Sequence, residues 1–198
     1  MKKVSDLKSA RFYKEEEENK IRCQLCPHSC LISESKTGIC QVRKNVNGKL
    51  YSLNYGKVSS LGVDPVEKKP LYHFYPQAEV LSLGSWGCNM SCQFCQNWQI
   101  SQQKPPLNDF KPEEIVQLAI RKNVDLIAYT YSEPTVFYEY MFDTAKIAQE
   151  NNIKNIMVSN GFIKQEALKE LIPYLDAANI DLKAFNDHFY NYYNLYNY

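Results

Sequence analysis

The chain has 198 residues, 44% of them hydrophobic, and a formal net charge of +1. This length suits one domain, or one domain with a small appendage. The near-neutral charge gives no electrostatic reason to expect nucleic acid or an anionic membrane as a partner. No apolar run approaches the roughly 18 residues of a membrane-spanning helix, and the polar N-terminus carries no signal-peptide stretch, so we expect a cytoplasmic protein.

The first 76 residues are predicted to form a cysteine-rich appendage. Residues 5–20 look helical. Residues 21–75 contain turns such as Asn47-Gly48 and short strand-like pieces such as 49–53. A segment of about 50 residues buries too little apolar surface for a large core of its own. We therefore predict that bound metal holds the appendage, residues 1–76, together.

The remaining residues, 77–198, alternate between strand-like and helix-like segments. Such alternation favours a parallel sheet built of βα units, so the fold class is α/β. The expected helices begin near Pro112, at Pro134 and at Lys164, and the third is interrupted near Pro173. The expected strands are 80–83, 125–129, 155–158 and 178–182.

The number of strands falls short of a closed barrel. Eight βα units take about 250 residues, whereas about four units are visible here. Eight of the last nine residues, 190–198, are Tyr or Asn, which makes a poor amphipathic helix and is typical of aggregation-prone sequence. We therefore predict a partial (β/α) barrel in a C-terminally truncated chain. The alternative is a natural short form.

All seven cysteines fall into two groups. One has the spacing C-x3-C-x2-C and the other C-x2-C-x3-C-x9-C. In a reducing compartment, clustered cysteines are more often metal ligands than disulfides, and a disulfide pairing would also leave one cysteine over. The first group is Cys88, Cys92 and Cys95, and the second is Cys23, Cys26, Cys30 and Cys40.

The three-cysteine group indicates an iron–sulfur cluster. Cys88, Cys92 and Cys95 offer three thiolates to one four-iron cluster and leave one iron without a protein ligand. A structural zinc site normally takes four protein ligands, and no fourth one lies nearby in the sequence. An open iron is a place where chemistry can occur.

The stretch 87–97 resembles the motif of radical S-adenosylmethionine (SAM) enzymes. The stretches 26–43, 64–76 and 95–101 resemble the radical enzyme of the AmmeMemoRadiSam system. That group is similar to pyruvate formate-lyase-activating enzymes, which install a glycyl radical on a partner protein. The resemblance covers about residues 21–190.

This resemblance implies a reaction and its cofactors. A [4Fe–4S] cluster on the three cysteines would be completed by SAM. Reductive cleavage of SAM would then release a 5′-deoxyadenosyl radical for hydrogen abstraction. The resemblance also implies a low-potential electron donor, flavodoxin or ferredoxin, and a partner protein as a candidate substrate. The alternative is a catalytically silent fragment that binds iron–sulfur clusters or zinc.

The resemblance further implies contacts to SAM after three strands. Glu133 lies in Tyr-Ser-Glu-Pro, where the family usually has a Gly-Gly-Glu-Pro that binds the methionine amino group. Its other interpretation is a carboxylate at a helix N-terminus. Ser159 and Asn160 lie in a stretch similar to the Thr-Asn-Gly-Phe of glycyl-radical activases. Asp181 and Lys183 match an Asp-Leu-Lys motif in which Lys183 would meet the methionine carboxylate, or else form a salt bridge.

The four-cysteine group permits two kinds of metal centre. Four thiolates can close a tetrahedral zinc site that stabilises a small appendage. They can equally hold a second iron–sulfur cluster that relays electrons. His28 could replace one thiolate. Lys68 and Lys69 lie between two prolines, in a loop that is either solvated or a lid over the site.

Overall fold

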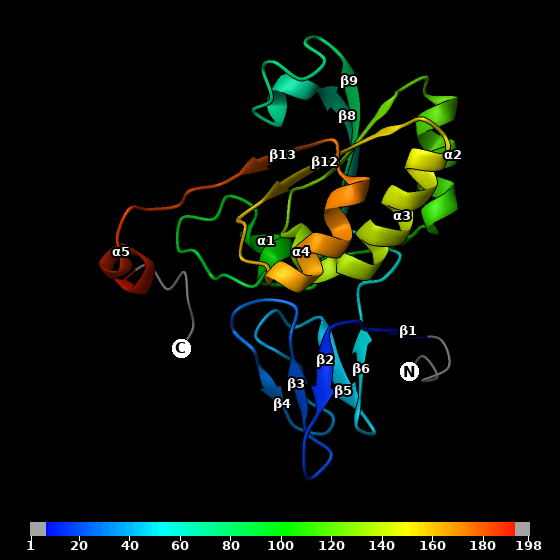
Figure 1. Ribbon diagram of the computed structural model, residues 1–198. Coiled ribbons are helices and arrows are strands. Elements are labelled where there is room, and N and C mark those ends of the chain that lie inside the picture. The colour runs from blue at the N-terminus through cyan, green and yellow to red at the C-terminus, as the bar shows by residue number, and fades with distance from the viewer. Residues whose placement is uncertain (1–6, 193–198) are drawn as a thin grey trace.

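The protein is described by a computed structural model over residues 7–192, and it has a mixed α/β architecture (Figure 1). The strands that precede the main parallel unit are β1 (Lys8–Ser9), β2 (Tyr13–Glu15), β3 (Ile21–Cys23), β4 (Leu31–Ile32), β5 (Arg43–Val46), β6 (Lys49–Ser52), β7 (Lys57–Val58) and β8 (Ser60–Pro65). The later strands are β9 (Glu79–Gly84), β10 (Asn108–Asp109), β11 (Leu126–Tyr129), β12 (Lys154–Ser159) and β13 (Ala177–Ile180). The helices are η2 (Val66–Lys68), α1 (Trp98–Ser101), α2 (Pro112–Arg121), η3 (Pro134–Phe137), α3 (Tyr138–Glu150), α4 (Gln165–Leu171), η4 (Ile172–Tyr174) and α5 (Asp187–Tyr192).

The N-terminal region forms two small antiparallel sheets, ordered β1-β6-β5 and β2-β3-β4. The helix predicted over residues 5–20 is wrong for its described part, which contains β1 and β2. The glutamate run instead enters a hairpin turn, where Glu18 and Asn19 have positive φ angles of 57° and 54°. Pairing β2 with β3 lets Ile21 face the core, and this tertiary burial overrides the helix propensity of glutamate.

The turn at Asn47-Gly48 joins β5 to β6, as the sequence predicts. Asn47 has a φ of 52° and Gly48 a φ of 71°. Positive φ at both central residues is the geometry of a type I′ hairpin turn, which favours Asn-Gly. The hairpin brings Arg43 and Leu50 into buried positions.

The main sheet has the order β13-β12-β11-β9-β8. Its four parallel strands, β9, β11, β12 and β13, confirm the strands predicted from the sequence. β8 was not predicted as part of this sheet, and it pairs antiparallel with the outer edge of β9. The domain boundary at 76/77 stays a prediction. The described strands form an open sheet rather than a closed barrel.

Helices α2, α3 and α4 cover one face of the sheet (Figure 1). Leu81, Ile127 and Met157 point into this face, and the same core cluster extends to Ile21 and Leu25 of the N-terminal region. The other face buries a smaller cluster, in which Val66 and the loop that follows η2 pack against the alternating strand residues.

Two helices depart slightly from their expected bounds. The segment predicted from Pro134 begins as the 3₁₀ turn η3 and continues as α3, and the interruption at Pro173 is confirmed as η4. Within residues 7–192, no helix is both long and apolar enough to cross a membrane. The end of the Tyr/Asn tail, residues 193–198, lies outside the described residues.

Candidate functional site

A cavity of about 810 Å³ lies at the carboxyl ends of the parallel strands, where ligands of open α/β sheets bind. It brings together two sets of residues that are far apart in the sequence. One set is the first cysteine group, and the other is the set of candidate SAM contacts; together the lining includes Cys88, Cys92, Cys95, Glu133, Ser159, Asn160, Asp181 and Lys183. Their convergence is a finding of the structure, whereas their roles as ligands stay predictions.

The cysteine loop leaves β9 through a glycine that no other residue can replace without strain. Gly87 has a φ of 90°, and a Cβ there would lie 2.7 Å from the Cys40 carbonyl oxygen. Just beyond it, the Met90 backbone N–H donates to Cys88 Sγ at 3.4 Å. Burial raises the pKa of the Cys88 thiol, and the negative charge of Glu133 raises it further.

Glu133 is buried and organises the loop after β12. Its Oε1 accepts hydrogen bonds from the Thr135 backbone N–H at 2.9 Å and from Ser159 Oγ at 2.7 Å, while Oε2 accepts from the Asn160 N–H at 2.9 Å. Burial outweighs these bonds and raises the pKa of Glu133. The bond to Thr135 confirms the interpretation of Glu133 as a carboxylate at a helix N-terminus. Contact with a methionine amino group stays a prediction.

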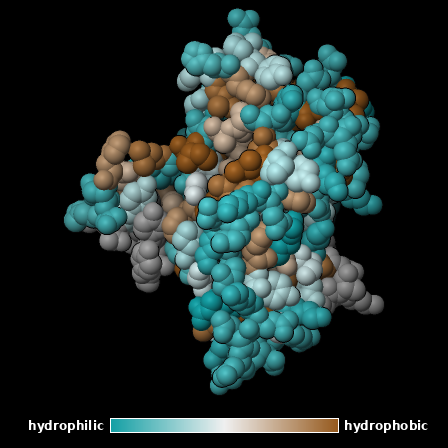
Figure 2. Space-filling model, viewed as in Figure 1, coloured by the Kyte–Doolittle hydropathy of each residue, from teal (hydrophilic) through white to brown (hydrophobic). Residues whose placement is uncertain are grey.

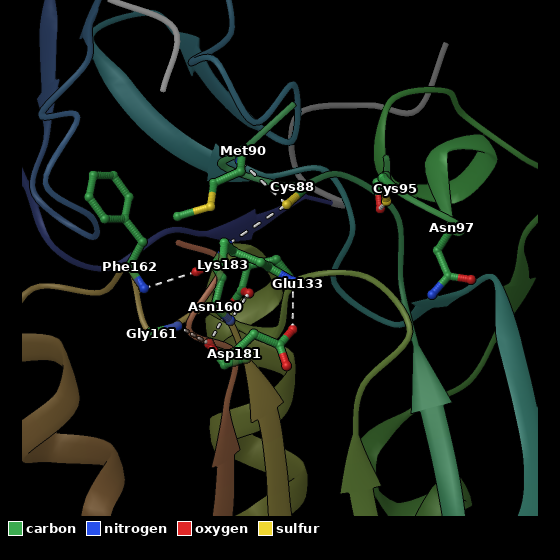
Figure 3. A network of polar contacts seen from close by, with 12 residues as sticks. Cys88, Met90, Cys95, Asn97, Glu133, Asn160, Gly161, Phe162, Asp181 and Lys183 are labelled. Atoms are coloured by element: carbon green, nitrogen blue, oxygen red, sulfur yellow. Dashed lines mark hydrogen bonds and ion pairs between the residues drawn. The ribbon is translucent and has the colours of Figure 1, made fainter. Parts of the chain in front are cut away.

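Asn160 joins the β12 loop to the cysteine loop (Figure 3). Its Nδ2 donates to Asn89 Oδ1 at 2.9 Å and lies 4.0 Å from Cys88 Sγ, and its Oδ1 accepts from the Phe162 N–H at 2.9 Å. Gly161 makes the turn with a φ of 70°. The asparagine side chain therefore fixes the distance between the two loops.

Asp181 and Lys183 lie just past the end of β13. The strand predicted over 178–182 ends at Ile180, so the pair belongs to a loop. Lys183 Nζ and Asp181 Oδ2 are 2.7 Å apart, which is the salt bridge that was the alternative for these residues. Burial alone would lower the pKa of Lys183, but its bond to Asp181 outweighs this effect and raises the pKa.

Sequence reasoning missed the contact between Asp64 and Tyr131 on the cavity wall, where Lys69 also lies. Tyr131 Oη donates to Asp64 Oδ2 at 2.9 Å, and Lys69 Nζ donates to the same oxygen at 3.1 Å while lying 5.0 Å from the Tyr131 ring centroid. Burial would raise the pKa of Asp64, but hydrogen bonds from Lys69, Lys68 and Tyr131 outweigh it and lower the pKa to about 2. Lys68 and Lys69, which the sequence places in a loop between two prolines, both line the cavity.

The four N-terminal cysteines line a second, much smaller cavity beside the cysteine loop. Without a metal, no three His, Cys, Asp or Glu side chains of residues 7–192 are already grouped as metal ligands. Either cysteine group would therefore adjust its side-chain rotamers on binding. His28 turns toward the cysteine loop, with Nε2 2.7 Å from the Asn89 carbonyl oxygen.

Comparison with known sequences identifies relatives. Residues 85–198 match the sequence model of the Radical SAM superfamily. An uncharacterized protein of Methanocaldococcus jannaschii, MJ0808, is 52% identical over 187 residues, which are 93% of this chain and 55% of that protein. A second uncharacterized protein of the same organism, MJ0674, is 25% identical over 177 residues, or 83% of this chain and 46% of that protein. The chain thus spans about half the length of the curated relatives it matches.

Proposed function

Because the chain belongs to the radical SAM superfamily, we propose that it cleaves SAM reductively and directs the resulting radical to hydrogen abstraction. The observation that carries this proposal is the single cavity lined by three thiols and by Glu133, Asn160 and Lys183. The resemblance to the AmmeMemoRadiSam enzymes and to pyruvate formate-lyase-activating enzymes narrows the proposed reaction to activase-like hydrogen abstraction.

Cys88, Cys92 and Cys95 would hold a [4Fe–4S] cluster. The residues fit this group, because three thiols face one cavity and the Met90 N–H donates to Cys88 Sγ, a kind of contact that tunes iron–sulfur clusters. When bound, the reduced cluster supplies the electron that breaks a C–S bond of SAM and releases the 5′-deoxyadenosyl radical. Met90 also lines the cavity, and its side chain is buried there.

The methionine end of SAM would be held by groups of opposite charge. The Glu133 carboxylate is suited to the ammonium, and Lys183 is suited to the carboxylate. Ser159 and Asn160 would set the position of Glu133, because Ser159 Oγ donates to its Oε1 and the Asn160 backbone N–H donates to its Oε2. Asp181 orients Lys183 through their salt bridge.

The partners of this reaction are also proposals. A flavodoxin or a ferredoxin would supply the electron, and a glycine of a partner protein is the substrate that the resemblance suggests. An electron donor and a protein substrate of these kinds would place the protein in the cytoplasm. The cysteines of the second group, Cys23, Cys26, Cys30 and Cys40, would form a separate metal centre, either a second iron–sulfur cluster or a zinc site.

The test is made on anaerobically reconstituted protein. Iron and sulfide are quantified, and 5′-deoxyadenosine is then assayed after addition of dithionite and SAM. Nucleoside that forms in the wild type but not in a Cys92→Ser variant is the expected result. An iron–sulfur cluster that binds without forming any nucleoside would favour the silent-fragment alternative and contradict the proposal for this chain.

A further inference from the structure

The small cavity is lined by all four cysteines of the N-terminal group. Cys23 is the last residue of β3, Cys26 and Cys30 lie in the loop that leads to β4, and Cys40 precedes β5. The cavity volume is about 10 Å³, which is about one water-sized sphere. The catalytic cavity is about 810 Å³ by the same measure. The four thiols therefore line one small cavity, whose volume is closer to that of a single ion than to that of a four-iron cluster.

Tight backbone turns carry three of these cysteines. The Ser29 N–H donates to the Cys26 carbonyl oxygen at 3.1 Å, and the Gln41 N–H donates to the Gly38 carbonyl oxygen at 2.9 Å. Each turn includes a residue with a positive φ angle, Ser29 at 47° and Gln41 at 65°. These turns place Cys26, Cys30 and Cys40 on the wall of the same cavity.

A buried cation with an unused donor also lines the cavity. Arg43 is 1% exposed, and its Nη1 and Nη2 each lie 3.0 Å from an oxygen of Glu139. Among the described residues, Arg43 Nε has no hydrogen-bond partner. A buried donor without a partner costs about 1–3 kcal/mol. A negatively charged thiolate centre in this cavity would provide a partner for this N–H.

We propose that Cys23, Cys26, Cys30 and Cys40 hold one tetrahedral metal ion, zinc or iron, as a structural centre. Four thiolates and one ion complete such a site, and the thiol protons pass to solvent on binding. His28 is not a ligand, because its Nε2 lies 2.7 Å from the Asn89 carbonyl oxygen and its ring packs against Phe162 at 5.0 Å.

This centre would lie directly beneath the catalytic cysteine loop. Trp86 packs in one hydrophobic cluster with Cys40 and Val42. A Cβ at Gly87 would meet the Cys40 carbonyl oxygen, so the two backbones pass close together, and Asn89 contacts His28. Trp86, Gly87 and Asn89 thus all lie against the segment that carries the proposed ion. The ion would therefore fix the start of the catalytic loop around Cys88.

The metal content of a variant without the catalytic thiols tests the proposal separately from radical activity. In the full-length Cys88→Ser/Cys92→Ser/Cys95→Ser protein, purified anaerobically, we expect about one zinc or one iron per chain and no acid-labile sulfide. Zinc or iron in that amount supports the single-ion site and identifies its ion. About four irons with four sulfides would overturn it in favour of a cluster, and the absence of metal would overturn it outright.

A second measurement keeps the test decisive if the triple variant fails to fold. Wild-type protein prepared without iron or sulfide is titrated with Co²⁺ alone. We expect one equivalent to produce the intense thiolate-to-cobalt absorption of a tetrahedral site. In the Cys30→Ser or the Cys40→Ser variant, this absorption should be lost or shifted. In the matched control, Cys95→Ser, it should be unchanged. The reverse pattern would assign the cobalt to the catalytic cysteines and refute the proposal.

Discussion

Replacing Glu139 by Gln should strongly destabilise the protein, because it leaves a buried positive charge without its partner. Arg43 and Glu139 are each 1% exposed and form two bonds of 3.0 Å. Burial alone would lower the pKa of Arg43, but the Glu139 charge outweighs it and raises that pKa. Glu139 also accepts the Arg11 backbone N–H at 2.7 Å. Breaking a buried pair from one side costs about 3–5 kcal/mol.

This loss is a large fraction of the about 5–15 kcal/mol that stabilises a typical domain. Urea denaturation of metal-loaded protein gives the free energy of unfolding of each variant. The matched control is Glu16→Gln, whose partner Arg22 is 38% exposed, and that change should cost less than about 1 kcal/mol. A loss of less than 1 kcal/mol for Glu139→Gln as well would show that water reaches Arg43, and would refute the electrostatic reasoning.

Three further outcomes follow from the site. Gly87→Ala should lower the free energy of unfolding by about 1–3 kcal/mol and lower the iron bound per chain, because φ is 90° and the new Cβ would meet the Cys40 carbonyl. The control for the steric part is Gly48→Ala, because Gly48 has a φ of 71° but no close contact. Equal iron in both variants would contradict the clash. Glu133→Gln should weaken SAM binding to cluster-loaded protein about 10-fold or more by equilibrium dialysis, because a charge-assisted bond is lost; unchanged affinity would remove Glu133 from the proposed contacts. Asp64 has a lowered pKa of about 2, so its stabilising effect is complete above about pH 4 and is lost as the pH falls toward 2. Asp64→Asn should therefore flatten this part of the acid-unfolding curve. An identical curve for the variant and the wild type would show that Asp64 titrates normally.

The parallel strands could be predicted because each is a short apolar run between turn signals. Every residue from Val80 to Leu83 and from Leu126 to Tyr129 is buried, so apart from Ser82 these segments form continuous apolar runs. The residues after each strand could then be placed at one edge. Glu133, Asn160 and Cys88 each follow one of these parallel strands, and the structure places them on one cavity.

The remaining features depend on contacts between distant segments. The residues of β1 and β2 follow no local pattern for a strand, and only pairing with β6 and β3 makes them strands. The bond between Tyr131 and Asp64 joins residues 67 positions apart, so no local motif reveals it. The contact of His28 with the Asn89 carbonyl likewise joins residues 61 positions apart, one from each cysteine group.

The main sheet ends in the antiparallel strand β8 at one edge and in the parallel strand β13 at the other. β9, the first parallel strand, already has neighbours on both sides, β11 and the antiparallel β8. At the opposite edge lies β13, and Figure 2 shows hydrophobic surface along this segment, where Ile180, Leu182 and Phe185 are exposed. At the other edge a further strand would pair with β8 and not with the parallel strand β9, whereas at this edge it would pair with β13. If strands were added beside β13 until the sheet closed into a barrel, the last strand would pair with β8 rather than with β9. That pairing would be antiparallel, and it would lie beside the loop that carries Lys69.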